Sequence, residues 1–321
     1  MSQKPRTSIW TNPYVQIARV DHWFKNVFIL PGIVIAIFVQ HELLNGSLSW
    51  KLVLGLLVAG LVSSSNYVLN EILDADKDRA HPVKQHRPVP SGKVNTRIAW
   101  MEWLMLALIG LSLAWVLGKG FFYSALALWV MSCFYNIPPI RTKEVPYLDV
   151  LSESINNPLR LLLGWYLTGT VLMAPVSLLF AYWMIGAFFM AVKRLAEYRT
   201  IGDENRAADY RASFVHYNER RLFVSIVYYT AAFGLCFGIF LMRYRLELVL
   251  SIPLIAAVTA WYLDLGFREN SPVQYPEKLY TETGLMLLLT VCLGAMLLLL
   301  FLDIPVLHDW LKQTTPGVTP N

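Results

Sequence analysis

Long apolar runs separated by short polar stretches dominate this sequence. Nine runs come close to or exceed the length that a helix needs to cross the hydrocarbon core of a bilayer. They span 27–44, 52–73, 98–117, 121–137, 148–172, 177–192, 222–242, 247–266 and 284–302. The run 121–137 is short, and 148–172 contains polar residues. The pattern predicts an all-α polytopic membrane protein, with nine transmembrane helices within residues 26–303.

Composition supports this class. Of the 321 residues, 56% are hydrophobic and only 15% are charged, whereas about a quarter of a soluble domain is charged. The three cysteines, Cys133, Cys236 and Cys292, lie far apart within apolar runs, a spacing that suits neither a zinc site nor a disulfide framework. The N-terminal segment lacks the pattern of a signal peptide. We therefore expect an integral, multi-pass protein of a bacterial inner or plasma membrane.

Basic residues indicate the orientation in the membrane. Most of the 27 lysines and arginines lie in the N-terminal arm 1–25 and in alternate loops, and the other side has Lys51, Lys119, Arg243, Arg245 and Lys312. The positive-inside rule places the arm in the cytoplasm and the short tail 304–321 outside. The large loops 74–97 and 193–221 are then cytoplasmic. Topology explains the charge, and no nucleic-acid motif accompanies it.

The second apolar run ends in an unusual group of acids, "NEILDADKD". On a helix with about 100° per residue, Asn70, Glu71, Asp74 and Asp78 lie on one face, and Asp76 lies on the far side. Carboxylates at this spacing repel one another unless a cation lies between them. Hard oxygen ligands at a water-accessible helix end suit Mg²⁺, which often bridges to substrate phosphates. The alternative is a solvated helix end, neutralised by neighbouring lysines and arginines.

A second polar stripe lies inside the fifth apolar run, "DVLSESINNPLR". Asp149, Glu153, Asn156 and Arg160 share one face of a helix, about three turns deep, and Pro158 loosens that helix. Ionisable groups at such depth are costly, and they normally line a cavity or pair with each other. The stripe predicts one wall of a polar chamber open to the cytoplasmic side, with an internal ion pair that fixes helix packing as the alternative.

Further polar groups lie at the cytoplasmic ends of other runs. Two of these groups bring cations: the segment "YNIPPIRTKEVPY" contains Tyr135, Arg141 and Lys143, and "DHWFKN" contains Lys25 and Asn26. Lysine and arginine suit the charge of a diphosphate, although ordinary topogenic charge is the alternative. Together with magnesium, such cations stabilise a diphosphate leaving group in a water-poor pocket. The pattern favours a site for a diphosphate attached to a lipid-soluble group.

The sixth run ends in a third cluster, "AVKRLAEYRTIGD". Lys193, Arg194 and Glu197 share a helix face. Gly202 is suited to ending the helix, which leaves Asp203 able to turn back. Simple positive-inside charge is an equal alternative for this cluster.

The arrangement resembles the UbiA superfamily of intramembrane prenyltransferases. Asn70, Glu71, Asp74 and Asp78 meet the family pattern N-D-x-x-D-x-x-x-D, with Glu71 as a conservative departure. The segments "YNIPPIRTKEVPYLD" and "DRAHPVKQHRPVPSG" are also similar to family segments, and the likeness covers nearly the whole chain. It implies a Mg²⁺-dependent prenyltransferase, which moves an isoprenoid group from a polyprenyl diphosphate to an aromatic or other lipophilic acceptor and releases diphosphate.

The resemblance also implies roles for residues. Asn70, Glu71, Asp74 and Asp78 are expected to bind the metal, and Asn70, Asp74, Asp78, Asp149 and Arg160 to take part in catalysis. Phosphate binding is expected of Lys25, Asn26, Arg141, Lys143, Lys193 and Arg194. Secondary roles are expected of Tyr135, Glu153, Asn156, Glu197 and Asp203. The expected partners are an isoprenoid phosphate or diphosphate lipid, a small acceptor molecule or phosphoribosyl diphosphate, and membrane lipids.

One departure from the family points to an alternative reaction. The family usually has a second aspartate-rich motif after the sixth helix, where this chain has K-R-x-x-E. With W-x-K-N at 23–26 and D-R-x-H-P-x-K-x-x-R-P at 78–88, it looks closer to the branch that makes decaprenyl-phosphoryl phosphoribose. The alternative is therefore transfer of phosphoribose from phosphoribosyl diphosphate to a polyprenyl phosphate. A secondary transporter is a remote alternative. Transporter sites lie near the membrane midplane, whereas the charged clusters of this chain, except that in the fifth run, lie at the cytoplasmic ends of the runs.

Overall fold

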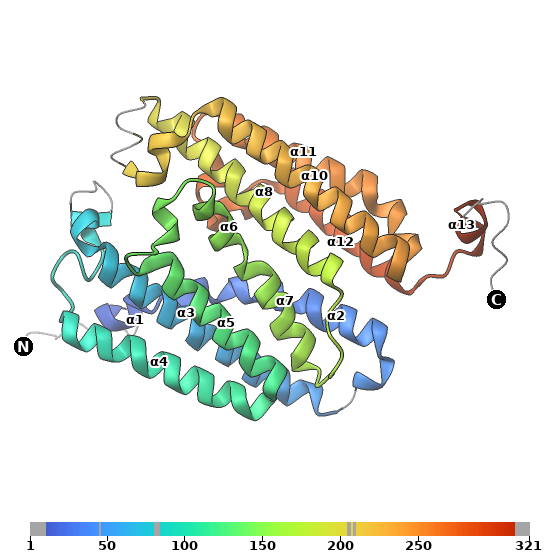
Figure 1. Cartoon of the computed structure of the whole chain (residues 1–321), viewed down its shortest axis with the longest axis horizontal. Helices are drawn as coiled ribbons and strands as arrows, with labels where there is room; N and C mark the ends of the chain where they lie inside the picture. The colour runs from blue at the N-terminus through green and yellow to red at the C-terminus, as the bar shows by residue number, and fades with distance from the viewer. Residues whose placement is uncertain (1–10, 45, 80–83, 204–206, 208–209, 312–321) are drawn as a thin grey trace, which may run out of the picture. The chain divides into compact units, whose positions relative to one another are not determined.

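The computed structural model describes residues 11–44, 46–79, 84–203, 207 and 210–311. Their regular secondary structure is all helical (Figure 1), and the 3₁₀ segments among the helices are named η in the text. The chain forms two compact units: residues 1–174 with 201–218, and residues 175–200 with 219–321. The predicted positions 80–83, 204–206 and 208–209, including His81 and Pro82 of the second motif, lie outside the described residues.

The first unit contains most of the predicted site. Its elements are α1 (Pro13–Ile17), η2 (Val20–Ile29), α2 (Leu30–Val39), η3 (His41–Leu43), α3 (Leu48–Arg79), η4 (Lys84–His86), α4 (Thr96–Leu117), α5 (Lys119–Asn136), η5 (Thr142–Glu144), α6 (Leu148–Ser154), α7 (Asn156–Leu167) and η6 (Ala212–His216). The second unit has α8 (Val176–Ile201), α10 (Glu219–Tyr244), η7 (Leu246–Ser251), α11 (Ile252–Phe267), η8 (Pro272–Gln274), η9 (Pro276–Thr281), α12 (Thr283–Phe301) and α13 (Pro305–Trp310).

The protein is a multi-pass integral membrane protein. Within the described residues, seven segments are long and apolar enough to cross a bilayer: Pro13–Val39, Leu48–Arg79, Thr96–Leu117, Val176–Ile201, Glu219–Tyr244, Leu246–Phe267 and Thr283–Phe301. The other two predicted runs are the two that looked weakest in the sequence. One forms α5, and the other is divided between α6 and α7.

The division of the fifth run corrects the prediction of one continuous helix. α6 ends at Ser154 and α7 begins at Asn156, so the chain breaks at Ile155. Pro158 lies in the first turn of α7, where its missing N–H costs little. The predicted stripe from Asp149 to Arg160 assumed one continuous helix. In the structure, Asp149 and Glu153 lie on α6, and Asn156 and Arg160 lie on α7.

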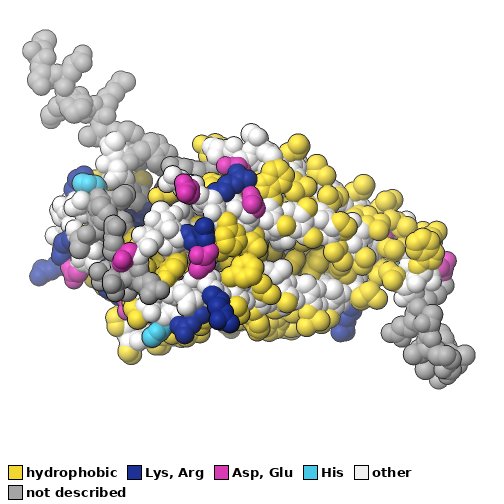
Figure 2. All heavy atoms as spheres, turned by 90° about the horizontal axis from the view of Figure 1, so that it is seen from above, with side chains coloured by type: hydrophobic (Ala, Val, Ile, Leu, Met, Phe, Trp, Pro, Cys, Tyr) yellow, Lys and Arg dark blue, Asp and Glu magenta, His cyan; other side chains and the backbone are white. Residues whose placement is uncertain are grey.

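Large apolar side chains cover much of the surface. Val53, Met101, Val171 and Leu287 are among the many exposed ones, and Figure 2 shows wide hydrophobic areas on the face in view. Such areas are rare on soluble monomers, and they are what a bilayer requires of its protein neighbours.

Helix packing in the first unit depends on close approach at small residues. α3 packs along α4 and α5, and α2 packs against α7. A methyl group added to Gly32 of α2 would lie 2.0 Å from the backbone oxygen of Leu161, and one added to Gly164 of α7 would lie 1.9 Å from that of Ile29. Small residues let membrane helices pack at short range, and this crossing admits no side chain at either glycine.

The length of α3 carries the first polar motif to the membrane surface. Its 32 residues span about 48 Å at 1.5 Å per residue, well beyond a hydrocarbon core of about 30 Å. The last turns, which contain Asp74 and Asp78, can therefore extend beyond the apolar layer. In the second unit, α8 ends as the sequence predicted, because Gly202 follows it with φ +68°.

Candidate active site

Asp74 is the centre of a compact ion cluster. Its Oδ1 lies 2.6 Å from Lys143 Nζ and 2.9 Å from Arg141 Nη2, and Asn70 Nδ2 donates to its Oδ2 at 3.2 Å. Asp74 and Asn70 come from α3, whereas Arg141 and Lys143 come from the loop after α5. The structure thus brings together two motifs that were predicted separately.

Asn136 joins these segments, and sequence reasoning missed it. Its Oδ1 accepts hydrogen bonds from Asn70 Nδ2 at 2.7 Å and from Lys143 Nζ at 2.9 Å. Its own Nδ2 donates to the Ser132 backbone oxygen. The signal was present in "YNIPP", where an amide follows Tyr135 at the end of the apolar run. Nothing in helix periodicity says that this amide turns toward another helix.

Burial weakens the proton affinity of Lys143. The residue is only 8% exposed, and desolvation lowers the pKa of its ammonium to about 8 although Asp74 acts in the opposite direction. Its Nζ also lies 6.0 Å from the centre of the Tyr135 ring. The side chain of Lys143 therefore loses its positive charge at mildly alkaline pH.

Glu144 completes the charge balance next to the cluster. It is bonded to Lys77 and accepts from Arg141 Nε at 2.9 Å. Burial would raise the pKa of Glu144, but the hydrogen bond from Lys77 and the charge of Arg141 outweigh that effect and hold its pKa below the ordinary value. Arg141 therefore forms ion pairs with both Asp74 and Glu144. Its backbone has a positive φ of +29°, which is uncommon for a residue other than glycine.

The remaining acids of the first motif have other partners. Asp78 Oδ2 lies 2.7 Å from Arg87 Nη1. Glu71 is 2% exposed and accepts from the Val89 backbone N–H at 3.1 Å, with Arg19 at 4.0 Å. The contacts with Arg87 and Val89 attach the segment after η4 to the end of α3. Glu71 therefore ties the loop to the helix in this structure.

Asp76 lies away from the ion cluster, on the helix face where the sequence predicted it. Its side chain is 92% exposed and pairs only locally with Arg79 at 2.5 Å, among the interactions of the described residues. It is separated from the cluster at Asp74, as the angle of about 100° per residue predicts.

The donor set at the end of α3 suits a magnesium ion in part. Asn70, Asp74 and Asp78 offer hard oxygen atoms of the kind that Mg²⁺ prefers. Among the described residues, however, Glu71, Asp74 and Asp78 do not converge as one metal-binding group. Deeper on the same helix, Ser63 Oγ and Asn66 Oδ1 are buried with no hydrogen-bond partner in the described structure. Buried polar atoms are rarely left so.

Asp149 lies at the centre of a buried latch. It is fully buried, and it accepts from Ser213 Oγ at 3.1 Å and from the Tyr217 hydroxyl at 2.7 Å, with Arg211 at 3.8 Å. The Tyr217 oxygen also accepts the backbone N–H of Tyr147 at 2.6 Å. Asp149 thereby holds the end of the loop that carries Arg141 and Lys143, and a direct part in catalysis stays a prediction.

The deeper polar residues gather around the break between α6 and α7. Tyr135 donates its hydroxyl proton to Glu153 Oε2 at 3.0 Å. Asn156 Oδ1 is buried with no hydrogen-bond partner among the described residues. Glu153 and Arg160 both interact electrostatically with Tyr67 of α3. These polar residues come from four helices of the first unit, α3, α5, α6 and α7. That they line a polar chamber stays a prediction.

Other predicted residues lie elsewhere. In η2, Asn26 is 3% exposed and Lys25 is half-buried. In the second unit, Arg194 of α8 is 1% exposed and its Nη1 lies 3.1 Å from Glu197 Oε2. The phosphate-binding roles of Lys25, Asn26, Lys193 and Arg194, and the secondary roles of Glu197 and Asp203, stay predictions.

The described residues form an all-helical membrane fold with an ion cluster at the end of the long helix α3. The model of the UbiA prenyltransferase family matches residues 27–288, and the chain belongs to this family. A decaprenyl-phosphate phosphoribosyltransferase from Mycolicibacterium smegmatis is 27% identical over 227 residues, which cover 70% of this chain and 69% of that protein. The uncharacterized protein y4nM from Sinorhizobium fredii is 26% identical over 165 residues, 51% of this chain but only 31% of that protein.

A solved structure supports the fold. A UbiA homolog from Archaeoglobus fulgidus bound to GPP and Mg²⁺ has a TM-score of 0.67 and 20% identity, and the match covers 90% of this chain and all of that one. At that identity the likeness concerns the fold. The predictions of an all-α UbiA-like architecture and of membership in this family are confirmed.

Proposed function

We propose that this chain transfers 5-phosphoribose from phosphoribosyl diphosphate to a polyprenyl phosphate, with release of diphosphate. A phosphate oxygen of the lipid attacks the anomeric carbon of the ribose. The bond between that carbon and the diphosphate oxygen breaks, and the diphosphate leaves with the electron pair. The reaction takes place at the cytoplasmic membrane surface, where the charge distribution places the end of α3.

The observation that carries the proposal is the pairing of two cations with Asp74. Lys143 and Arg141 lie within 2.9 Å of one carboxylate oxygen and are largely buried. A diphosphate entering this site offers both cations several more acceptor oxygens than one carboxylate does. They stabilise the charge that grows on the leaving group, and low solvent exposure strengthens that effect.

The chemistry of the donor atoms suits magnesium, although the acids do not converge as one metal-binding group in the described residues. Asp74 and Asp78, with Asn70, would hold the ion, and Mg²⁺ would supply further neutralisation of the diphosphate. Once Arg141 and Lys143 turn to the substrate, Asp74 gains lone pairs for a metal or its waters. The solved homolog that binds Mg²⁺ supports a magnesium-dependent reaction here.

The choice of phosphoribosyl diphosphate over a polyprenyl diphosphate as the donor rests on the comparisons and on the motif that follows the sixth apolar run, 177–192. A named relative that aligns over 70% of this chain is a phosphoribosyltransferase. The K-R-x-x-E motif at 193–197 replaces the second aspartate-rich motif of the family. Prenyl transfer from a polyprenyl diphosphate to a lipophilic acceptor is the second candidate, which the family and the homolog bound to GPP favour.

Diphosphate release from two donors tests the proposal. Purified protein in lipid receives Mg²⁺ in two separate tubes. One contains phosphoribosyl diphosphate with a polyprenyl phosphate, and the other contains a polyprenyl diphosphate with a panel of aromatic acceptors. We expect release only in the first, and loss of release when the metal is chelated.

The other outcomes are decisive too. Release only in the second tube replaces phosphoribosyl transfer with prenyl transfer. Absence of release in both, from protein with an intact cooperative thermal transition, contradicts both candidates. An Asp74→Asn variant serves as the matched inactive control in either tube.

A further inference from the structure

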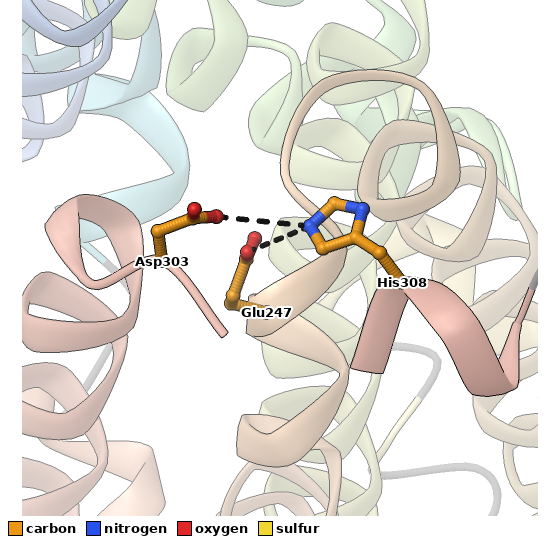
Figure 3. Close-up of side chains that lie close together, drawn as sticks. All are labelled: Glu247, Asp303 and His308. Atoms are coloured by element: carbon orange, nitrogen blue, oxygen red, sulfur yellow. Dashed lines mark hydrogen bonds and ion pairs between the residues drawn. The ribbon is translucent and has the colours of Figure 1, made fainter. Parts of the chain in front are cut away.

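Three side chains of types that can bind a metal meet in the second unit, far along the sequence from the motifs of the candidate active site. Glu247 lies in η7, Asp303 follows α12, and His308 lies in α13, and Figure 3 shows their side chains pointing toward one another. His308 Nε2 lies 2.9 Å from Glu247 Oε1 and 3.9 Å from Asp303 Oδ1. One ligand atom from each residue lies within 4.8 Å of the others.

We propose that Glu247, Asp303 and His308 bind a transition-metal dication of the zinc type, which fastens α13 to η7 and the end of α12. Zinc takes nitrogen and oxygen ligands at about 2.0–2.2 Å, so its tetrahedral ligands lie about 3.3 Å apart. The separations of 2.9 Å and 3.9 Å bracket that value. An imidazole with two carboxylates suits zinc better than magnesium, which prefers oxygen alone.

The surroundings of Glu247 are those of a supported ligand. Its side chain is fully buried, and its Oε1 accepts the Ile304 backbone N–H at 3.3 Å. Arg245 Nε lies 3.1 Å from Oε2 and donates to the Leu299 backbone oxygen. Oε2 is nevertheless a buried atom that accepts no hydrogen bond of ordinary geometry among the described residues. Partners such as the Ile304 N–H and Arg245 orient metal-binding carboxylates in proteins.

The position of α13 explains what a metal would add. The helix has six residues, and none of them is buried. Apolar packing therefore contributes little to its attachment, whereas one metal ion joining three segments would hold it firmly. Three protein ligands also leave one coordination position for water. The positive-inside rule predicts that the cluster lies on the non-cytoplasmic side of the membrane, so it would take its metal from that side.

Zinc titration of the full-length protein in lipid nanodiscs tests the site. Millimolar Mg²⁺ is kept present to saturate hard-oxygen sites, and a chromophoric chelator competes for zinc. We expect one zinc per protein, absent from empty nanodiscs. Loss of a group that only orients a ligand typically weakens metal binding 10–100-fold. His308→Ala and Asp303→Asn remove or weaken a ligand itself, so each should weaken zinc binding by at least about tenfold.

Two variants serve as matched controls. His41→Ala removes another exposed histidine on the same predicted side, and Asp74→Asn alters the proposed magnesium site; neither should change zinc affinity. Hydrogen exchange gives a readout that does not involve turnover. Zinc should slow exchange in residues 302–311 of the wild type, and not in His308→Ala.

Two results overturn the proposal. One is zinc affinity that stays unchanged in His308→Ala, which places the ion elsewhere. The other is absence of stoichiometric zinc binding to folded wild-type protein, which leaves the cluster as an ion pair and hydrogen bond. Neither result bears on the proposed transferase activity.

Discussion

At the level of single residues, the candidate site depends on what Asp74 contacts. Asn70, Arg141 and Lys143 all bond to it, and Asn136 bonds to two of these three partners. Breaking such a buried network by removing one charge leaves the other charges uncompensated. Substitutions that keep the shape of the side chain are therefore the informative ones.

Asp74→Asn and Asp78→Asn should each lower turnover by about 100-fold or more, the usual cost of removing a group that stabilises charge in the transition state. Asp76→Asn should change turnover by less than about twofold, because its side chain is exposed and pairs with Arg79. Initial rates of diphosphate release at saturating Mg²⁺ measure this. Equal losses in all three variants would contradict the assignment of helix faces.

The pH dependence of donor binding should reveal Lys143. Because its pKa is lowered to about 8, the ammonium is present at pH 7 and mostly lost at pH 9. The KM for the donor should therefore rise about tenfold between pH 7 and pH 9, the range that spans this pKa, while kcat changes less.

Lys143→Arg is the control for that profile, since arginine keeps its charge throughout this range. Its KM should be nearly constant between pH 7 and pH 9. If the wild type and Lys143→Arg give the same profile, Lys143 does not bind the donor in its charged form.

Residue roles within one helix were accessible from the sequence, and roles across segments were not. The angle between side chains separates Asp76 from Asp74 because both lie on one regular helix. The contact of Asn136 with Asn70, and the use of Glu71 to hold Val89, depend on how a loop folds back. How the loop folds back depends on packing between distant segments, and the periodicity of hydrophobic residues along the sequence does not predict such packing.

At the level of elements, the loop after α5 is positioned by a latch beneath it. The backbone of Tyr147 has φ +65°, an uncommon conformation for a bulky residue, and its N–H is held by Tyr217. Tyr217 in turn donates to the buried Asp149. The latch thereby transmits the position of η6 to the loop that carries Arg141 and Lys143.

Tyr217→Phe should loosen this loop and raise the KM for the donor by about fivefold to tenfold, since it removes two hydrogen bonds of about 1 kcal/mol each and leaves a buried carboxylate short of a donor. Tyr228→Phe, at an exposed tyrosine of α10, is the matched control and should have no effect. A fall in thermal stability with unchanged KM would show that Tyr217 has a purely structural role.

The crossing of α2 and α7 predicts a strong dependence on glycine. Gly164→Ala should destabilise the protein by about 1–3 kcal/mol, the usual cost of forcing an extra methyl into a packed interior, because its methyl would meet the Ile29 backbone oxygen. Gly294→Ala, which meets nothing within 4 Å, is the control. Thermal unfolding in detergent compares them, and equal midpoints would refute the close approach.

Element boundaries show where sequence reasoning stops. The end of α8 at Gly202 follows from local chemistry, since glycine readily adopts a positive φ. The break at Ile155 was not predicted, because the apolar pattern continues through it and Pro158 pointed to a loosened helix rather than two. Breaks of this kind are tolerated in membranes where neighbouring groups satisfy the freed backbone atoms.

At the level of the whole molecule, hydropathy and charge determine most of the architecture. The bilayer requires backbone groups to be satisfied within each helix, so runs of apolar residues predict an all-α membrane protein directly. Seven of the predicted spans are clear in the described residues. The two weaker runs form α5 and the pair α6 and α7, which contain much of the polar wall. The polar residues of 148–172 explain why that run looked unlike a membrane span, whereas 121–137 is short.

The proposed reaction of this UbiA-family protein moves phosphoribose onto a lipid phosphate. The most direct test supplies phosphoribosyl diphosphate labelled in the ribose carbons, together with a polyprenyl phosphate and Mg²⁺, to purified wild-type protein in lipid. We expect the label to enter the organic phase, with one diphosphate released for each labelled phosphoribose transferred. Label that stays in water, while folded protein releases diphosphate from a polyprenyl diphosphate and an acceptor, would contradict it.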